Sequence, residues 1–324
     1  MIELLKQGNK SSLMACAVNF FIGLLRGGAW IMTGSPAMFA ETMHAFADSA
    51  NQGFVYVGTA LSKKEPTDRF PNGFGRVVNL VCLAAVLIVA IMSYETIKEG
   101  FLHILHPTVG GALGILLPVF GIGVVLEFFV FYKAMKYVVA ETGVEAKGLS
   151  VVGASFRNLK KASPATRLVF MEDLVASSGG VLAIIAVLLG HFTPFVQAEG
   201  VVSMIIGISM FYVVSRVFLD NVSGAIGEAD HTMEARVGEF VMNDPDVNDI
   251  QKVVVLREGE DLHVELEIEV DPSLTIKQAD AIKDRLEEQI LSQEGIANVT
   301  IEFDQLDQIA HWEEKKQKLD EIIK

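Results

Sequence analysis

The hydrophobic positions of this 324-residue chain fall into six long stretches. Each stretch is close to the roughly 20 residues that an α-helix needs to cross a bilayer. Glycines are scattered through all six, as is common where membrane helices pack closely. The predicted spans are residues 11–32, 37–61, 77–97, 109–132, 168–189 and 200–219. The pattern therefore predicts a polytopic α-helical membrane protein with six transmembrane helices.

The pattern changes after residue 228. Residues 230–242 carry apolar side chains at helical spacing, and residues 250–256 and 262–270 form two strand-like runs around a short polar turn. Ser273 is the expected N-cap of a helix that ends at Leu291 and has Ile276 among its inward-facing residues. Residues 299–303 add a third strand. This order, αββαβ, predicts a small α+β domain with its helices on one face of a three-stranded sheet.

These patterns divide the chain into three expected regions. Residues 1–228 form a six-helix transmembrane transport domain, and residues 229–305 form the αββαβ domain in the cytoplasm. Residues 306–324 are a charged tail that we expect to form a solvated helix.

Basic residues set the expected orientation of the helices. They lie before the first span, between the second and third, and between the fourth and fifth, whereas the opposite side shows little beyond Lys98. The residues that carry this bias are Lys6, Lys10, Lys63, Lys64, Arg69, Arg76, Lys133, Lys136, Lys147, Arg157, Lys160, Lys161 and Arg167. Because basic loops stay in the cytoplasm, both termini are predicted to be cytoplasmic, and the chain to lie in the cytoplasmic (inner) membrane.

Composition narrows the class further. The net charge is −14, and its acidic excess is concentrated after residue 228, which argues against binding to nucleic acid. Cys16 and Cys82 lie in apolar segments without the spacing of a disulfide framework or a thiolate metal site. No nucleophile–base set, phosphate-binding loop or zincin motif is present, so an enzyme is not expected.

The second span carries polar residues that a membrane helix tolerates only for a reason. Glu41, His44 and Asp48 recur at helical spacing and form one stripe, with Asn51 about a turn beyond. His44 and Asp48 would offer one nitrogen and one oxygen ligand to the same point, and Asp173 on the fifth span could add another oxygen. Such a set suits zinc and is acceptable to manganese, iron or cobalt. The alternative is that these groups only hydrogen-bond to neighbouring helices.

Several motifs together resemble the cation diffusion facilitator family. They are TGSPAMFAETMHAFADSANQG in the second span, AIGEAD after the sixth span, the six spans themselves and the αββαβ domain. The resemblance covers residues 11–304 and implies that a divalent metal, commonly zinc, is bound between the second and fifth helices and exchanged for protons. It also implies a homodimer whose cytoplasmic domain has a metallochaperone-like fold.

The fifth span departs from the usual pattern of the family. The family places two ligands four residues apart there; Asp173 matches the second ligand, but Val169 stands at the first. The sequence around Glu172 and Asp173 resembles the branch that contains the ninth animal zinc transporter. We therefore expect His44, Asp48 and Asp173 as transport ligands and leave Glu172 open, because on an ideal helix it lies about 100° away from Asp173. Glu127 is a further candidate ligand, with a pairing to Arg26 as the alternative.

Other family metal sites are weaker in this chain. The loop between the second and third spans has no histidine, so the accessory site found there in many members is expected to be absent. The positions that match metal ligands of the cytoplasmic domain are Glu267, Asp280, Glu302 and Asp304. Carboxylates bind borderline metals more weakly than imidazole does, so a solvated acidic surface is the alternative. The remaining histidines, including His311, are expected to be ordinary surface or interfacial residues.

The resulting hypothesis is export of a divalent metal by alternating access, driven by protons. Binding a metal releases protons from its ligands, and His44 is suited to couple the two because histidine titrates near pH 6.5. The alternative hypothesis is a membrane-anchored metal sensor or scaffold without net transport. Dimerisation would be favoured by an exposed apolar face of the small sheet, and Arg76 and Glu228 are a candidate ion pair at the membrane surface.

Overall fold

The computed structural model describes residues 7–71, 73–107, 113–162, 164–258, 261–293, 295–307 and 309–323. The described residues form two compact units. A helical unit lies within residues 5–57 and 81–220, and a second unit lies within residues 58–80 and 221–324.

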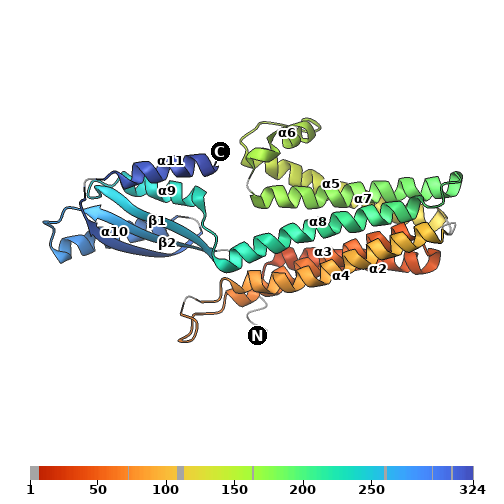
Figure 1. The fold of residues 1–324 in the computed structure, drawn as a ribbon, viewed down its shortest axis with the longest axis horizontal. Helices are drawn as coiled ribbons and strands as arrows, with labels where there is room; N and C mark the ends of the chain where they lie inside the picture. Colours follow the sequence, from red (N-terminus) through yellow and green to blue (C-terminus); the bar gives the residue numbers. More distant parts are fainter. Residues whose placement is uncertain are drawn as a thin grey trace. The chain divides into compact units, whose positions relative to one another are not determined.

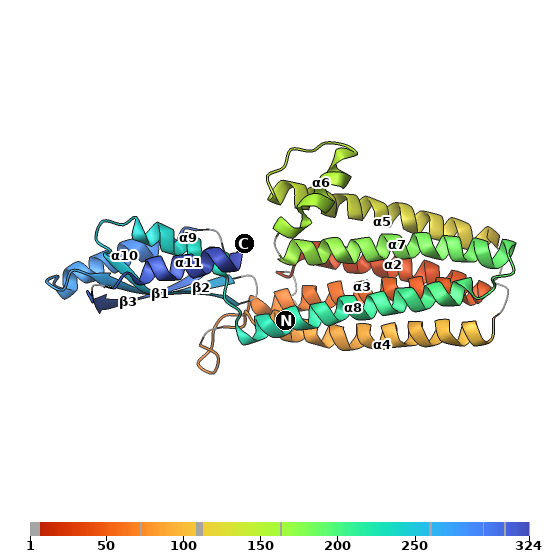
Figure 2. The same cartoon turned by 45° about the horizontal axis from the view of Figure 1, so that its top comes forward.

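Long helices run side by side in the helical unit (Figures 1 and 2). They are α2 (Lys10–Thr33), α3 (Pro36–Ser62), α4 (Val77–Leu105), α5 (Leu113–Glu141), α7 (Pro164–Phe192) and α8 (Ala198–Ile226). Within the described residues, all of these except α3 are long and apolar enough to cross a membrane. Helix α3 has 27 residues, enough to span, and is the helix that carries Glu41, His44 and Asp48. The six predicted spans therefore all form helices, although residues 109–112 of the fourth lie outside the described part.

A tight turn reverses the chain between α2 and α3. Gly34 has a φ of 65°, and its N–H donates to the carbonyl of Trp30, which ends α2. Ser35 begins α3, because its Oγ accepts a hydrogen bond from the Met38 N–H at 3.2 Å. The Ser35 hydroxyl also donates to the carboxylate of Glu199 at the start of α8, and both side chains are buried.

Glycines allow α4 and α8 to approach closely. A Cβ at Gly100 would lie 2.6 Å from the Gly200 carbonyl oxygen, and a Cβ at Gly200 would lie 2.7 Å from the Gly100 oxygen. Side chains at these two positions would collide with backbone. The pair is thus a small-residue contact of the kind that joins membrane helices.

A short surface segment follows α5. Helix α6 (Ser150–Asn158) and the 3₁₀ turn η1 (Leu159–Lys161) pack against α5 and α7. Phe131, Phe156 and Phe170 meet edge-on there, with ring centroids 5.1 to 6.4 Å apart. This aromatic cluster is the core of the region.

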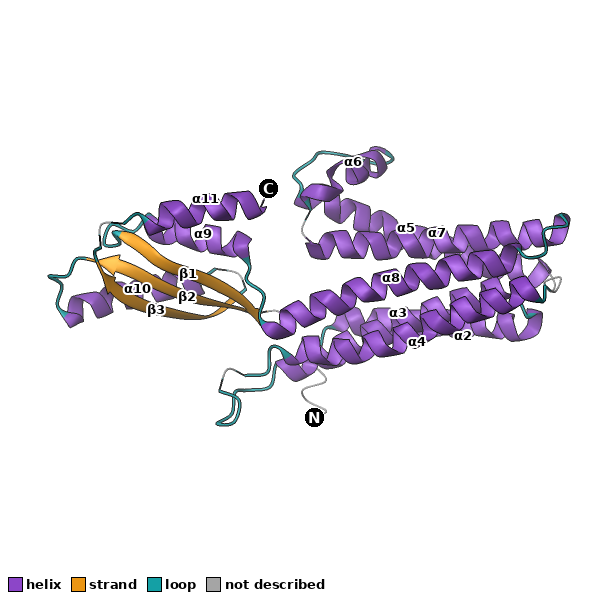
Figure 3. Cartoon of the chain, viewed as in Figure 1, coloured by secondary structure: helices purple, strands orange, loops and turns teal. Residues whose placement is uncertain are grey.

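The second unit contains a three-stranded sheet with helices on one face (Figures 2 and 3). Its strands are β1 (Asp249–Glu258), β2 (Asp261–Val270) and β3 (Ile296–Gln305), with β1 and β2 antiparallel and β2 and β3 parallel. Its helices are α9 (His231–Met242), α10 (Ile276–Leu291) and α11 (His311–Ile323). The predicted αββαβ order is confirmed.

The start of α10 differs from the prediction. Thr275, not Ser273, is the N-cap, and Thr275 and Gln278 form a reciprocal capping box. Ile276 is 90% exposed, so its predicted inward orientation is wrong. Ile282 and Leu286 are buried as predicted.

The C-terminal helix α11 is not simply solvated. Trp312 and Leu319 are buried in the same core as α9, α10 and the sheet. The Trp312 ring lies against Gly238 of α9, where a Cβ would overlap it. The predicted tail helix is therefore an integral layer of this unit.

The sheet face away from the helices is mixed, which corrects the expected apolar face. Val254 and Leu256 stand opposite Glu265 and His263 in the antiparallel register, and Lys252 pairs with Glu265 at 3.1 Å. A face of this composition does not require an apolar partner. The predicted Arg76–Glu228 pair is also not formed, since Arg76 binds Glu258 at 2.6 Å.

Candidate metal transport site

The polar stripe of α3 is divided between two environments. Glu41 lies 3.1 Å from Arg26 in a fully buried ion pair. His44 and Asp48, one turn further along, form their own pair with 3.5 Å between Nε2 and Oδ2. The shared helix face predicted from spacing is real, but only its second part faces the candidate metal site.

That site is a cavity of about 450 Å³ within the helical unit. Its carboxylates and its histidine come from α3 and α7: His44 and Asp48 from the first, and Glu172 and Asp173 from the second. Neutral polar side chains also line it, namely Asn51 and Gln52 of α3 and Ser11 and Asn19 of α2. Lys133 of α5 also lines the cavity. From the sequence, Lys133 was assigned only to the basic residues that set the membrane orientation. Its position in the sequence does not show that it lies near His44.

The cavity contains polar atoms without full hydrogen-bond partners, and these atoms suit a cation. The Nε2 atom of His44 is buried and has no hydrogen-bond partner among the described residues. Asp48 is 46% exposed, and because it lines the cavity, this surface faces the cavity space. An imidazole nitrogen and a carboxylate that both lack full pairing are ready-made ligands for a divalent ion.

Glu172 and Asp173 both line the cavity, despite the angle between them on an ideal helix. The two acids lie on the same stretch of α7, which faces the space in front of His44. The arrangement is open rather than closed: within the described residues, His44, Asp48 and Asp173 do not bring one ligand atom each within 4.8 Å of the others. A bound ion would need these ligand atoms to draw closer.

Glu127 follows the alternative interpretation. Its Oε1 lies 2.6 Å from the Arg26 guanidinium, and it is not among the residues that line the cavity. Arg26 is thus held between Glu41 and Glu127. Glycines on α7 make room for these carboxylates, because a Cβ at Gly179 or Gly180 would lie 3.1 Å from Glu41 Oε1 or 2.9 Å from Glu127 Oε2.

The cavity occupies one half of the helical unit. Its lining comes from the first half of α2, α4 and α7, the middle of α3, the second half of α5 and residues 210–217 of α8. The opposite half is filled by a packed apolar cluster that includes Ala29, Met38, Leu116, Phe120 and Val187. The site is therefore approached from the end of the unit at which α8 finishes.

The candidate ligands of the second unit are dispersed. Glu267 and Glu302 are register partners on β2 and β3, Asp304 lies opposite Glu269 near the end of β3, and Asp280 lies on α10. Within the described residues they form no group of three with ligand atoms in mutual reach. The group that does form is Glu269, Asp307 and His311, which the sequence did not indicate because its members come from separate segments.

Comparison with known proteins identifies the family. Residues 12–224 match the family described as the cation efflux transmembrane domain, and residues 229–306 match the cation efflux protein cytoplasmic domain. Together these matches cover most of the chain. They confirm the resemblance and the six-helix and α+β architecture predicted from the sequence.

Individual relatives agree with this assignment. The chain is 27% identical over 238 residues to the proton-coupled zinc antiporter SLC30A9, mitochondrial, of Xenopus laevis, which covers 73% of this chain and 41% of the relative. It is 25% identical over 257 residues to a probable cation efflux system protein of Mycobacterium tuberculosis, covering 78% of this chain and 70% of the relative.

A third relative is the zinc transporter ZitB of Yersinia pseudotuberculosis, with 25% identity over 282 residues, 86% of this chain and 81% of the relative. The chain spans less than half of the length of the SLC30A9 relatives that it matches. The two family matches, which together extend from residue 12 to residue 306, show that this chain belongs to the cation efflux family, a family of multi-pass membrane transporters rather than enzymes.

Proposed function

We propose that the chain exports a divalent transition metal from the cytoplasm by alternating access, in exchange for protons, with zinc as the first candidate. The observation that carries this proposal is the cavity that collects His44, Asp48 and Asp173 inside a bundle of membrane helices. Charged and imidazole groups are costly at such a depth unless they serve a transported ion.

The donor set decides which ions fit. His44 would supply a nitrogen, and Asp48 and Asp173 would supply oxygens, with Glu172 beside them as a third carboxylate or as a proton acceptor. One imidazole with two or three carboxylates suits zinc in a tetrahedral shell and also accepts manganese, iron or cobalt. The zinc named for SLC30A9 and ZitB supports zinc as the first ion to test.

Proton coupling follows from competition for the same ligands. A metal ion binds the deprotonated imidazole and carboxylates, so protons and metal exclude each other at His44, Asp48 and Asp173. Histidine ordinarily titrates near pH 6.5, which lies within the range that a membrane pH gradient spans. Protons entering from an acidic outer side would therefore release the metal there.

The position of the cavity supports an inward-facing conformation. The basic loops favour a cytoplasmic position for the ends of α3, α5 and α8, and the cavity extends toward those ends. The other half of the bundle is closed by the apolar cluster around Phe120. Cytoplasmic metal would enter this state, and rocking of the helices would then open the other half.

The match to the cytoplasmic-domain family also supports a homodimer, which we include in the proposal. Crosslinking in the native membrane, followed by sizing of the product, tests this part. A single-chain product at all crosslinker concentrations would contradict it.

The decisive experiment is zinc accumulation in proteoliposomes that carry an imposed pH gradient. We expect Asp48→Asn and His44→Ala to reduce uptake to the level of empty liposomes, and collapse of the gradient to do the same to the unmodified protein. Glu95→Gln is the matched control, because Glu95 is a half-exposed carboxylate on α4 that pairs with Lys98 and lies outside the cavity.

Two outcomes would overturn the proposal. Unchanged uptake in both Asp48→Asn and His44→Ala would remove these residues from the site. Saturable zinc binding without accumulation in the unmodified protein would instead identify the chain as a metal sensor or scaffold.

A further inference from the structure

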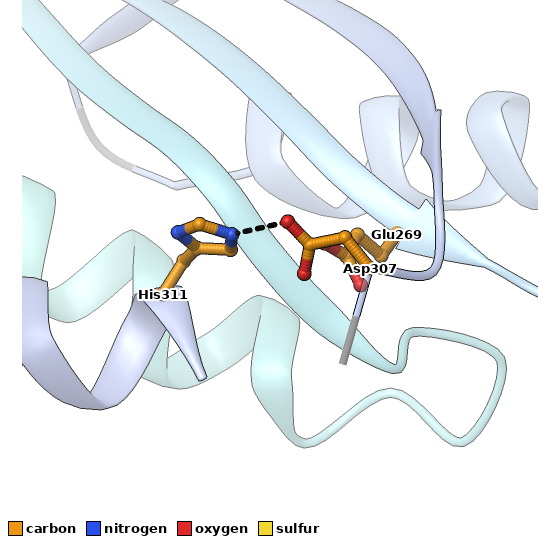
Figure 4. Close-up of side chains that lie close together, drawn as sticks. All are labelled: Glu269, Asp307 and His311. Atoms are coloured by element: carbon orange, nitrogen blue, oxygen red, sulfur yellow. Dashed lines mark hydrogen bonds and ion pairs between the residues drawn. The ribbon is translucent and has the colours of Figure 1, made fainter. Parts of the chain in front are cut away.

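Three residues of the second unit converge at the base of α11 (Figure 4). Glu269 lies near the end of β2, Asp307 follows β3, and His311 is the first residue of α11. One ligand atom from each lies within 4.8 Å of the other two, and His311 Nε2 is 2.9 Å from Asp307 Oδ2. Within the described residues, no other group of three histidines, cysteines or carboxylates is this close.

Glu269 is the unusual member of this cluster. It is 1% exposed, and its Oε1 is buried without a hydrogen-bond partner. Among the described residues, the recorded ion pairs give neither Glu269 nor Asp307 a lysine or arginine. Burial, followed by the nearby carboxylates of Asp307 and Asp249, raises the pKa of Glu269. Asp307 hydrogen-bonds to the Glu269 carboxyl group, but Oε1 keeps no partner. A buried oxygen without a partner is costly, and a bound cation would satisfy it.

The cluster is also held in place by its surroundings. Asp249 of β1 accepts hydrogen bonds from the backbone N–H groups of His311 at 2.6 Å and Trp312 at 3.2 Å. Trp312 is itself buried in the core. The first turn of α11 is thereby fixed against β1, and the His311 ring is directed to the carboxylates before any ion arrives.

We propose that Glu269, Asp307 and His311 form a second divalent-metal site that fastens α11 to the sheet. One imidazole nitrogen and two carboxylate oxygens are the donor set that zinc, manganese or cobalt accepts, with water completing the shell. The 2.9 Å between His311 Nε2 and Asp307 Oδ2 is close to the separation of two ligands on one ion. The partly exposed Asp307 gives the ion a route to solvent.

This site is distinct in composition and location from the transport cavity. None of its three residues lines the cavity. They also differ from the candidate ligands predicted for the cytoplasmic domain, which are Glu267, Asp280, Glu302 and Asp304. The inference does not depend on transport: it concerns an ion that stays with the protein and joins β2, the segment after β3 and α11.

The test uses the purified full-length protein, stripped of metal, and zinc as the sole added ligand. The background carries His44→Ala and Asp48→Asn so that the transport cavity does not contribute. Bound zinc is counted by equilibrium dialysis, and hydrogen exchange reports the protection of the α11 amides. At a zinc concentration of about 100 times the Kd, linkage predicts about 100-fold slower exchange for a helix that opens only when the ion leaves.

Three substitutions and one control define the result. His311→Ala and Glu269→Gln should each remove one zinc per chain and abolish the zinc-dependent protection of α11. Asp307→Asn gives the same test at a partly exposed position, where misfolding is not a concern. His263→Ala should change neither readout, because His263 has a carboxylate neighbour, Glu258, but belongs to no three-residue group among the residues that the structure describes.

The inference is overturned if His311→Ala and Asp307→Asn bind as much zinc as their background. It is also overturned if zinc leaves exchange in α11 unchanged, since the cluster would then be a hydrogen-bonded group in which Glu269 and Asp307 share a proton. A variant that loses transport but still binds zinc at this site, or one that loses this zinc but still transports, shows that the two proposals stand or fall separately.

Discussion

At the scale of single residues, the charged side chains inside the helical unit form two groups that differ in how fully they are paired. Arg26 is 2% exposed and lies between Glu41 and Glu127, at 3.1 Å and 2.6 Å. In this group one guanidinium serves two carboxylates and none of the three lines the cavity, whereas His44 and Asp48 line it and remain only partly paired. Helical spacing placed Glu41, His44 and Asp48 on one face. It could not show where that face passes from an arginine partner on α2 to the cavity, because this depends on contacts between distant segments.

Replacing Arg26 with methionine should destabilise the protein strongly. The substitution leaves two carboxylates buried without a cation, and removing one partner of a buried ion pair typically costs about 3–5 kcal/mol. Thermal unfolding in detergent should show a large fall in Tm. Adding Glu41→Gln and Glu127→Gln should recover most of this loss, since the interior then holds no unpaired charge. Equal Tm values for the single variant and the unmodified protein would show that the ion pair does not stabilise the fold.

At the scale of elements, the helices were the most predictable part and their ends the least. The six apolar runs predicted their helices well, because length and hydropathy alone define a span. The start of α10 was missed by two residues, although Thr275 and Gln278 have the spacing of a capping box. Trp312 and Leu319 are seven residues apart and share one face of α11, but a helix with two buried residues and many charges has no sequence signal that distinguishes it from a solvated one.

The contact between α4 and α8 leads to a prediction with an internal control. Gly100→Ala should lower the stability of the helical unit by about 1–3 kcal/mol, because the new methyl group would lie 2.6 Å from the Gly200 carbonyl oxygen and 2.8 Å from the Met204 nitrogen. Gly121→Ala on α5 should have no such cost, since nothing lies within 4 Å of its Cβ position. Alanine there should instead favour the helix by up to about 1 kcal/mol.

Thermal unfolding of the two variants in the same detergent makes this comparison. A similar shift in both would mean that the loss reflects the glycine-to-alanine change itself and not the approach of α4 to α8.

At the scale of the whole molecule, the sequence predicted the transmembrane and the cytoplasmic part of the chain. It predicted the ligands on the fifth span only in outline. The αββαβ order followed from local patterns, and the family followed from motifs spread over the full length. The conformation could not be predicted, because the cavity and the apolar cluster around Phe120 are made by residues that are far apart in the chain. The same reason hides the Glu269, Asp307 and His311 group.

The proposed inward-facing conformation predicts one-sided chemical access. In a background with Cys16 and Cys82 replaced by serine, a cysteine at Val214, which lines the cavity, should react with a membrane-impermeant thiol reagent from the cytoplasmic side. A cysteine at Val187 should not react from either side, since this position is packed within the apolar cluster and does not line the cavity. Inside-out and right-side-out vesicles provide the two directions. Labelling of Val214→Cys solely from the outer side would contradict the proposed conformation.

The hydrogen bond between Ser35 and Glu199 should affect the free-energy difference between the conformations of the whole molecule. It joins the α2–α3 turn to the first turn of α8 at the closed end of the bundle, so opening that end has to break it. A hydrogen bond to a charged group contributes about 1.5–3 kcal/mol, which corresponds to a tenfold or greater change in the ratio of inward to outward states. This contact would therefore raise the fraction of time that the empty protein spends in the proposed inward-facing state. In Ser35→Ala the cysteine at Val214 should then spend less time accessible, and its labelling should slow in proportion.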